Sequence, residues 1–182
     1  MCYSLKSILN QAGYKTNLYT SPHLLSYTER YVFDDKEINE EDLIELLTGV
    51  EKTLGDDNAT LFEILTCAFL KYAESFKDNI NIIEAGLFHQ FDSTNVFKEN
   101  LMTLIGVIHN DHFQWLENKS IEGVIYEKTA KLLNSNIFIN KQVNNEIRDK
   151  IESSLEKNTS NKYFFGKDFN IAKSENGFIQ YQ

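Results

Sequence analysis

An apolar run from Ile80 to Ile83, followed at once by Glu84 and Gly86, is the feature that most constrains how this chain can fold. The run has the length of a buried strand. In an open α/β sheet, ligands bind beyond the carboxyl ends of the strands. Glu84 is therefore placed for chemistry rather than for core packing, and a polar cluster follows it at Asp92-Ser93-Thr94-Asn95.

A second apolar run, Leu101 to Ile108, repeats this pattern and ends in His109-Asn110-Asp111-His112. Helical periodicity separates the strand patterns along the chain. Strands that alternate with helices predict an α/β fold with a mostly parallel open sheet and flanking helices. The other expected strands are residues 15–20, 137–139 and 163–165, and the expected helices are residues 2–12, 39–54, 60–72, 120–132 and 143–155.

Local signals fix several helix ends. Gly13 is placed to end the first helix, and Asn39 and Ser120 can cap later ones. Thr60 with Glu63 three residues on has the spacing of a capping box. Residues 27–38 are typical of a small hairpin or extended loop with Asp-Asp-Lys at its tip, and residues 178–181 belong to an expected edge hairpin.

Composition limits the classes of function. A chain of 182 residues with 42% hydrophobic residues predicts one globular domain. The formal charge of −9 argues against a nucleic-acid binder, which needs clustered Lys and Arg. Cys2 and Cys67 form no disulfide framework, which indicates a reducing cytoplasm. No apolar run approaches the roughly 20 residues of a membrane span, and no signal-peptide pattern is present.

Four clusters carry the candidate chemistry: Ser21-Pro22-His23, Glu84 with Asp92, Asp111-His112, and Lys128. Each has a structural alternative, respectively a simple turn, a helix cap or surface carboxylate, a loop histidine, and a solvated helix side chain. Their recurrence at strand ends, or on an adjacent helix, favours one shared site. Carboxylate and imidazole beside a phosphate site suit Mg²⁺, which takes few protein ligands.

The chain resembles the folylpolyglutamate synthase/dihydrofolate synthase family of the Mur ligase superfamily. The resemblance is ordered and spans nearly the whole chain. It is carried by residues 12–24, Glu29-Arg30 with Ile38, residues 60–66, Glu84-Ala85-Gly86-Leu87, Asp92-Ser93-Thr94-Asn95, Asp111-His112, Glu127-Lys128 and residues 163–169.

This resemblance implies an ATP-dependent ligase that adds L-glutamate to dihydropteroate or to folate. Glu84 and His112 match the magnesium ligands, and Lys128 matches a lysine that becomes carbamylated. The loop Thr20-Ser21-Pro22-His23 would border the folate pocket. Asp92, Asn95 and Asp111 are expected supporting residues, and the expected assembly is a monomer.

The chain departs from the family pattern at two places that matter for activity. No Gly-x-x-x-x-Gly-Lys-Ser/Thr phosphate loop occurs in the sequence, and in the family it directly precedes the residue that matches Met1. Phe88-His89-Gln90 stands where the family has Gly-Gly-Arg. We therefore expect residues 1–182 to form a partial central ATP-binding domain that lacks its first strand, its phosphate loop and the C-terminal ligase domain.

Three hypotheses follow from these observations. The first is a ligase homologue that is inactive as this chain alone. The second is a non-catalytic remnant or complementation fragment that associates with a separately encoded phosphate-loop segment. The third is a small metal-dependent hydrolase built on Glu84, Asp111 and His112, which no closely spaced ligand motif supports.

Overall fold

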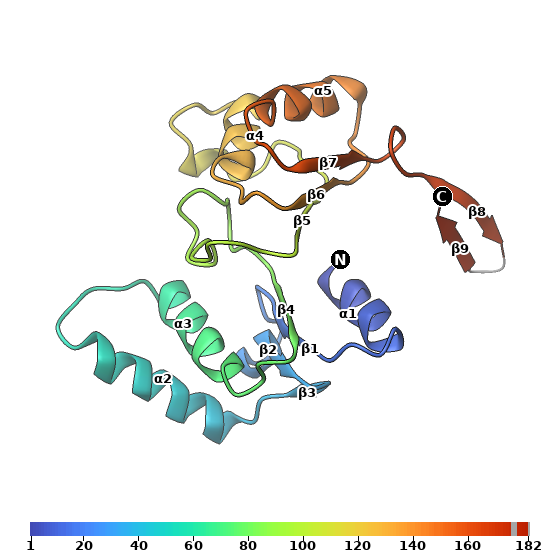
Figure 1. The fold of residues 1–182 in the computed structure, drawn as a ribbon. Helices are drawn as coiled ribbons and strands as arrows, with labels where there is room; N and C mark the ends of the chain where they lie inside the picture. Colours follow the sequence, from blue (N-terminus) through green and yellow to red (C-terminus); the bar gives the residue numbers. More distant parts are fainter. Residues whose placement is uncertain (176–177, 182) are drawn as a thin grey trace. The chain divides into compact units, whose positions relative to one another are not determined.

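The computed structural model describes residues 1–175 and 178–181, which divide into two compact units. The N-terminal unit comprises Met1–Gly86 and Asp92–Thr94, and the C-terminal unit comprises Leu87–Phe91 and Asn95–Gln182. Figure 1 shows helices and strands in both units. No helix within these described ranges is long and apolar enough to cross a membrane.

The N-terminal unit is built on a four-stranded sheet with the order β3-β2-β1-β4. Strands β1 and β4 are parallel, while β2 pairs antiparallel with both β1 and β3. Its elements are α1 (Cys2–Gln11), β1 (Thr16–Tyr19), the 3-10 helix η1 (Tyr27–Arg30), β2 (Tyr31–Phe33), β3 (Lys36–Glu37), α2 (Glu40–Leu54), α3 (Leu61–Ala73) and β4 (Ile80–Ile83).

The predicted helix ends of this unit are confirmed. The Asn39 side chain accepts a hydrogen bond from the Asp42 amide, and Thr60 with Glu63 forms the capping box of α3. Gly13 follows α1 with a φ of +89°, a left-handed conformation that costs glycine little. The predicted hairpin exists as β2 and β3, but the residues before it form η1 rather than extended chain.

The two faces of this sheet bury different side chains. On one face Tyr19, Tyr31 and Phe33 of the sheet form an aromatic cluster with Phe69 of α3. Leu43 of α2 belongs to the same buried cluster. On the other face Leu18, Val32 and Ile82 pack against Cys2, Leu5 and Leu9 of α1. Helices therefore flank the sheet on both sides, as an α/β fold requires.

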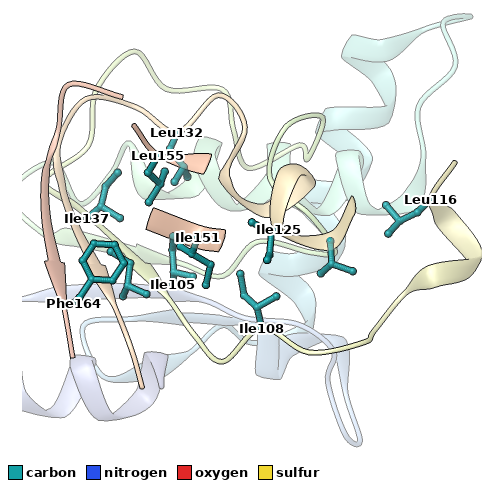
Figure 2. Packing of buried hydrophobic residues seen from close by; sticks show 11 residues of the cluster. Ile105, Ile108, Leu116, Ile125, Leu132, Ile137, Ile151, Leu155 and Phe164 are labelled. Atoms are coloured by element: carbon teal, nitrogen blue, oxygen red, sulfur yellow. The ribbon is translucent and has the colours of Figure 1, made fainter. Parts of the chain in front are cut away.

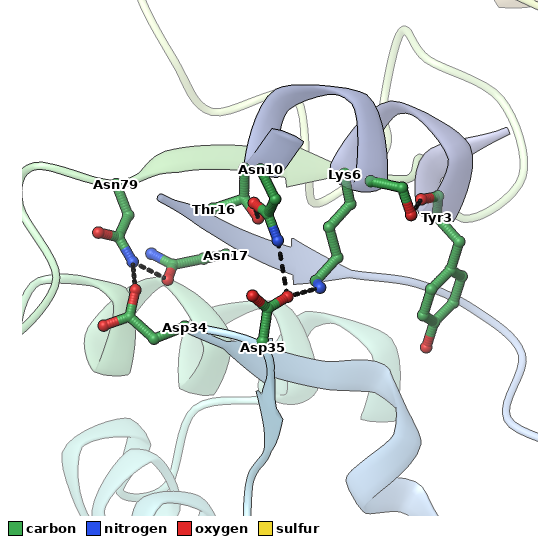
Figure 3. Close-up of polar contacts among 9 residues, drawn as sticks. Tyr3, Lys6, Asn10, Thr16, Asn17, Asp34, Asp35 and Asn79 are labelled. Carbon is green, nitrogen blue, oxygen red and sulfur yellow. Dashed lines mark hydrogen bonds and ion pairs between the residues drawn. The ribbon is translucent and has the colours of Figure 1, made fainter. Parts of the chain in front are cut away.

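Polar contacts tie the β2–β3 turn to its surroundings (Figure 3). Asp35 accepts a hydrogen bond from Asn10 at 2.6 Å and pairs with Lys6, both on α1. Asp34 accepts from Asn79 at 2.7 Å, and Asn79 also donates to Asn17 at 2.9 Å. These contacts lie where β1 and β4 begin, so they fix the sheet end opposite to Glu84.

The C-terminal unit is built on a parallel sheet with the order β5-β6-β7. Its core gathers apolar residues of the strands, α4 and α5, among them Ile105, Ile137, Ile151 and Phe164 (Figure 2). The elements are β5 (Met102–Ile105), the 3-10 helix η2 (Phe113–Trp115), α4 (Ile121–Thr129), β6 (Asn136–Ile139), α5 (Asn145–Ser154), β7 (Asn161–Phe164) and an antiparallel pair, β8 (Ile171–Glu175) and β9 (Phe178–Tyr181).

The predicted strand at Leu101–Ile108 is shorter than expected because a distant glutamine ends it. The Gln142 side chain accepts from the Ile108 amide at 2.9 Å and donates to the Gly106 carbonyl at 3.1 Å. These side-chain bonds replace the strand ladder beyond Ile105. The predicted fold class is nevertheless confirmed: both units are α/β with parallel strand pairs and flanking helices.

Replacing Val124 tests the packing of the C-terminal unit. Val124 is fully buried in α4, and we expect Val124→Ala to lower the free energy of unfolding by about 2 kcal/mol, since it removes buried apolar groups and leaves a cavity. Val143, which is 64% exposed, supplies the matched control. Denaturant unfolding that shows equal losses for Val124→Ala and Val143→Ala would contradict this packing.

Candidate functional site

Glu84 lies where two parallel strands end together. Tyr19 and Ile83 are register partners in the β1–β4 pair, and the Glu84 amide continues the ladder by donating to the Tyr19 carbonyl at 2.9 Å. The half-buried Glu84 carboxylate accepts the Ser21 amide through Oε2 at 3.0 Å. The structure thus confirms that Glu84 stands at a strand's carboxyl end, beside the loop Thr20–His23.

The loop Thr20–His23 is also held from the side of η1. The Thr20 amide donates to the Arg30 carbonyl at 3.2 Å, and Arg30 Nε donates to His23 Nδ1 at 2.9 Å. Because Nδ1 accepts this bond, the proton of a neutral His23 ring is assigned to Nε2. The His23 ring also packs on Tyr27, with 4.2 Å between ring centroids.

Asp92 fixes the turn that follows Glu84. Its Oδ2 accepts the Gly86 amide at 2.9 Å, and its Oδ1 accepts the Thr94 amide at 3.0 Å and hydroxyl at 2.6 Å. A Cβ on Gly86 would lie 2.5 Å from the Phe62 ring, so only glycine fits there without movement. Asp92 therefore holds this turn, while its supporting role in the site stays a prediction. Asn95 lies in the C-terminal unit, where it donates to the Gln90 carbonyl at 3.5 Å.

Lys128 and His112 contact the same side chain, Phe88, in the C-terminal unit. Lys128 Nζ donates to the Leu87 carbonyl at 3.2 Å and lies 5.7 Å from the centroid of the Phe88 ring. The His112 ring meets Phe88 edge-on, with 6.0 Å between centroids. Attraction between a cation and a ring face suits an ammonium at Lys128.

His112 and Asp111 lie in a loop beyond β5 rather than directly at its end, because the strand stops at Ile105. His112 has a left-handed backbone with a φ of +59° and starts η2. Its ring Nε2 lies 3.3 Å from Asp111 Oδ2, an ion pair when the imidazole is protonated.

The candidate metal ligands are divided between the two units. Glu84 belongs to the N-terminal unit and His112 to the C-terminal unit, so their joint ligation stays a prediction. Within residues 1–175 and 178–181, no group of three or more His, Cys, Asp or Glu side chains is arranged to hold a metal ion. Burial, and then the Glu84 charge, raise the pKa of the Cys2 thiol, so a thiolate ligand at Cys2 is disfavoured.

Two residues matter more in the structure than sequence reasoning suggested. Glu29 accepts three backbone amides, those of Leu24, Leu25 and Ser26, and these bonds lower the pKa of its carboxyl group. The Ser26-x-x-Glu29 spacing of a capping box could have indicated this role. For Phe88, no local signal in the sequence indicates its contacts with Lys128 and His112.

Two curated proteins that this chain resembles share one name. A scan against protein-family models finds no match. The chain is 37% identical to the dihydrofolate synthase/folylpolyglutamate synthase of Bacillus subtilis over 133 residues, covering 69% of this chain and 30% of that protein. It is 35% identical to the protein of the same name from Escherichia coli over 115 residues, covering 63% of this chain and 27% of that protein.

Solved structures of folylpolyglutamate synthases share the fold of this chain. A bifunctional folylpolyglutamate synthase/dihydrofolate synthase from Yersinia pestis, complexed with AMPPNP and Mn ion, superposes with a TM-score of 0.86 at 26% identity, covering 100% of this chain and 43% of that chain. E. coli FolC in complex with DHPP and ADP superposes with a TM-score of 0.84 at 27% identity, covering 96% of this chain and 41% of that chain.

The fold is therefore that of the solved folylpolyglutamate synthase structures. The resemblance of the sequence to the folylpolyglutamate synthase/dihydrofolate synthase family is confirmed, since the curated relatives carry that name. The chain spans about 30% of the length of these relatives.

Gly86 supplies a test of the turn after Glu84. We expect Gly86→Ala to lower the free energy of unfolding of the N-terminal unit by about 1–3 kcal/mol, because the new Cβ would collide with Phe62. Gly106 is the matched control, since a Cβ there meets nothing within 4 Å. Thermal unfolding in which Gly86→Ala and Gly106→Ala behave alike would contradict the close approach of Phe62.

Proposed function

We propose that this chain forms part of an ATP-dependent ligase that joins L-glutamate to dihydropteroate or to folate. The observation that carries the proposal is the Glu84 carboxylate held on the Ser21 amide, at the shared carboxyl end of β1 and β4. That edge is where ligands bind in open α/β sheets. The names of the relatives supply the reaction and the substrates.

Glu84 and His112 are the proposed ligands of a divalent metal, Mg²⁺. One Glu84 oxygen is occupied by Ser21, and the other accepts no hydrogen bond from the residues that the structure describes, so it is available to a cation. Carboxylate oxygen is the donor that Mg²⁺ prefers, with water and phosphate oxygens completing its coordination. When bound, the metal would supply charge neutralisation at the phosphates of ATP.

The loop Thr20–His23 is the proposed border of the folate pocket. Hydrogen bonds to Glu84 and Arg30 hold this loop in one conformation. A loop that is already fixed loses little conformational entropy when a ligand binds, which favours binding. Asp92 supports the site by fixing the turn after Glu84, and Asp111 by pairing with His112. Asn95 is a further proposed supporting residue.

Lys128 is the proposed site of carbamylation. In the structure its Nζ contacts the Leu87 carbonyl and the Phe88 ring, which suit an ammonium. A carbamate is anionic and would face the negative ring face, so modification requires Lys128 to leave Phe88.

The proposed reaction follows the family in two steps. A substrate carboxylate attacks the γ-phosphorus of ATP, which forms an acyl phosphate and releases ADP. The amine of L-glutamate then attacks the acyl carbon, an amide bond forms, and phosphate leaves. Residues 1–182 contain no phosphate-loop pattern. We therefore propose that residues 1–182, as a partial central domain, need a phosphate-loop segment to catalyse either step.

A complementation fragment is the second proposal. In this case the phosphate loop comes from a separately encoded segment. We further propose that the complete ligase is a cytoplasmic monomer, and the free cysteines Cys2 and Cys67 suit the reducing conditions of the cytoplasm.

Glutamate ligation is the direct test. We expect the purified chain to form no product from ATP, glutamate and dihydropteroate or tetrahydrofolate. Addition of the segments of the B. subtilis relative that this chain does not match is expected to give ADP and a glutamylated product. Glu84→Gln should reduce that rate at least 100-fold, whereas Glu74→Gln on the exposed end of α3 should leave it unchanged.

Two results would contradict this account. Turnover by residues 1–182 alone that Glu84→Gln abolishes would refute the need for a supplied phosphate loop. Binding of these added segments without any ligation, under conditions where the complete relative is active, would refute the ligase function.

A further inference from the structure

The Glu29 side chain holds the segment that continues from the loop Thr20–His23. Its Oε2 accepts the Leu24 amide at 2.8 Å, and its Oε1 accepts the Leu25 amide at 2.7 Å and the Ser26 amide at 2.8 Å. Hydrogen bonds to an ionised carboxylate are stronger than neutral ones. One carboxylate thus fixes three consecutive peptide units.

Core packing does not hold this segment. The Leu24 and Leu25 side chains are 89% and 94% exposed, and neither belongs to a buried cluster of its unit. A loop without buried apolar side chains is mobile unless polar contacts fix it. Its conformation therefore depends on the Glu29 carboxylate.

Arg30, which follows Glu29 in the sequence, contacts the loop Thr20–His23 directly. Arg30 donates to the His23 ring and accepts the Thr20 amide, while Glu84 takes the Ser21 amide. Residues 20–26 are thus held by Glu29, Arg30 and Glu84, all within the N-terminal unit.

We propose that Glu29 is a positioning residue for ligand binding: by holding Leu24–Ser26 it fixes the loop Thr20–His23 for a folate-type ligand. This role rests on the proposed function. Glu29 does not touch the ligand itself. By fixing the loop before the ligand binds, Glu29 reduces the conformational entropy that the loop loses on binding, and this raises the affinity.

Glu29→Gln is the informative variant. The glutamine side chain keeps one acceptor oxygen, which can accept either the Leu24 amide or the amides of Leu25 and Ser26. Its NH₂ group would then face the remaining backbone N–H groups, which are donors as well. Glu63 is the matched control. It closes the capping box of α3 through the Thr60 amide and hydroxyl, at 2.6 and 2.7 Å, as Glu29 does for η1.

Two measurements on the wild-type chain, Glu29→Gln and Glu63→Gln test the proposal. Amide hydrogen exchange followed by NMR reports on Leu24, Leu25 and Ser26, and fluorescence titration reports the affinity for folic acid. We expect Glu29→Gln to speed exchange at these amides and to weaken folic acid binding, each about tenfold. Glu63→Gln should change neither, and the two variants should lose similar thermal stability.

The outcomes separate this proposal from the function on which it rests. Unchanged exchange at residues 24–26 in Glu29→Gln would overturn the positioning role. Faster exchange with unchanged folic acid affinity would also overturn it, since a purely structural cap predicts that pair of results. Failure of the wild-type chain to bind folic acid would instead overturn the proposed function, together with any effect of Glu29 on affinity.

Discussion

The parallel pairing of β1 with β4 is the interaction on which the candidate site depends. Its register places Tyr19 beside Ile83, so the next residues of both strands leave the sheet at one point. Glu84 and Ser21 are 63 residues apart in the sequence, and they meet there because β1 and β4 end together. The Tyr19 ring anchors this end of β1 in the aromatic cluster under α3. The packing of Tyr19 against α3 therefore fixes the end of β1 and, with it, the position of Ser21 beside Glu84.

The sequence predicts what local chemistry determines. Strand β4, the caps at Asn39 and Thr60, and the position of Glu84 follow from apolar runs and short-range hydrogen bonds. It does not predict the early end of β5, because Gln142 lies far along the chain. The contacts of Phe88 with Lys128 and His112 were equally hidden, since they join segments that only the fold brings together.

The proposed chemistry is shared between the two units. The N-terminal unit carries the carboxylate of Glu84 and the loop Thr20–His23, both held by backbone hydrogen bonds. The C-terminal unit carries His112 and Lys128, both in contact with Phe88. Hydrogen bonds fix the first set within the N-terminal unit. In the second set, the Phe88 ring favours the unmodified ammonium of Lys128.

Paramagnetic broadening by Mn²⁺ tests the central claim most directly, because it locates a divalent cation without requiring turnover. In an NMR titration of the chain with Mn²⁺, we predict that the amide signals of Ser21 and Glu84 broaden first. The groove between α4 and α5 offers an internal comparison, because it holds Glu122, Glu146 and Asp149 beside Lys150, which pairs with the two glutamates. Signals of Ser21 and Glu84 that stay sharp while those of the groove broaden would contradict a metal site at the end of β1 and β4.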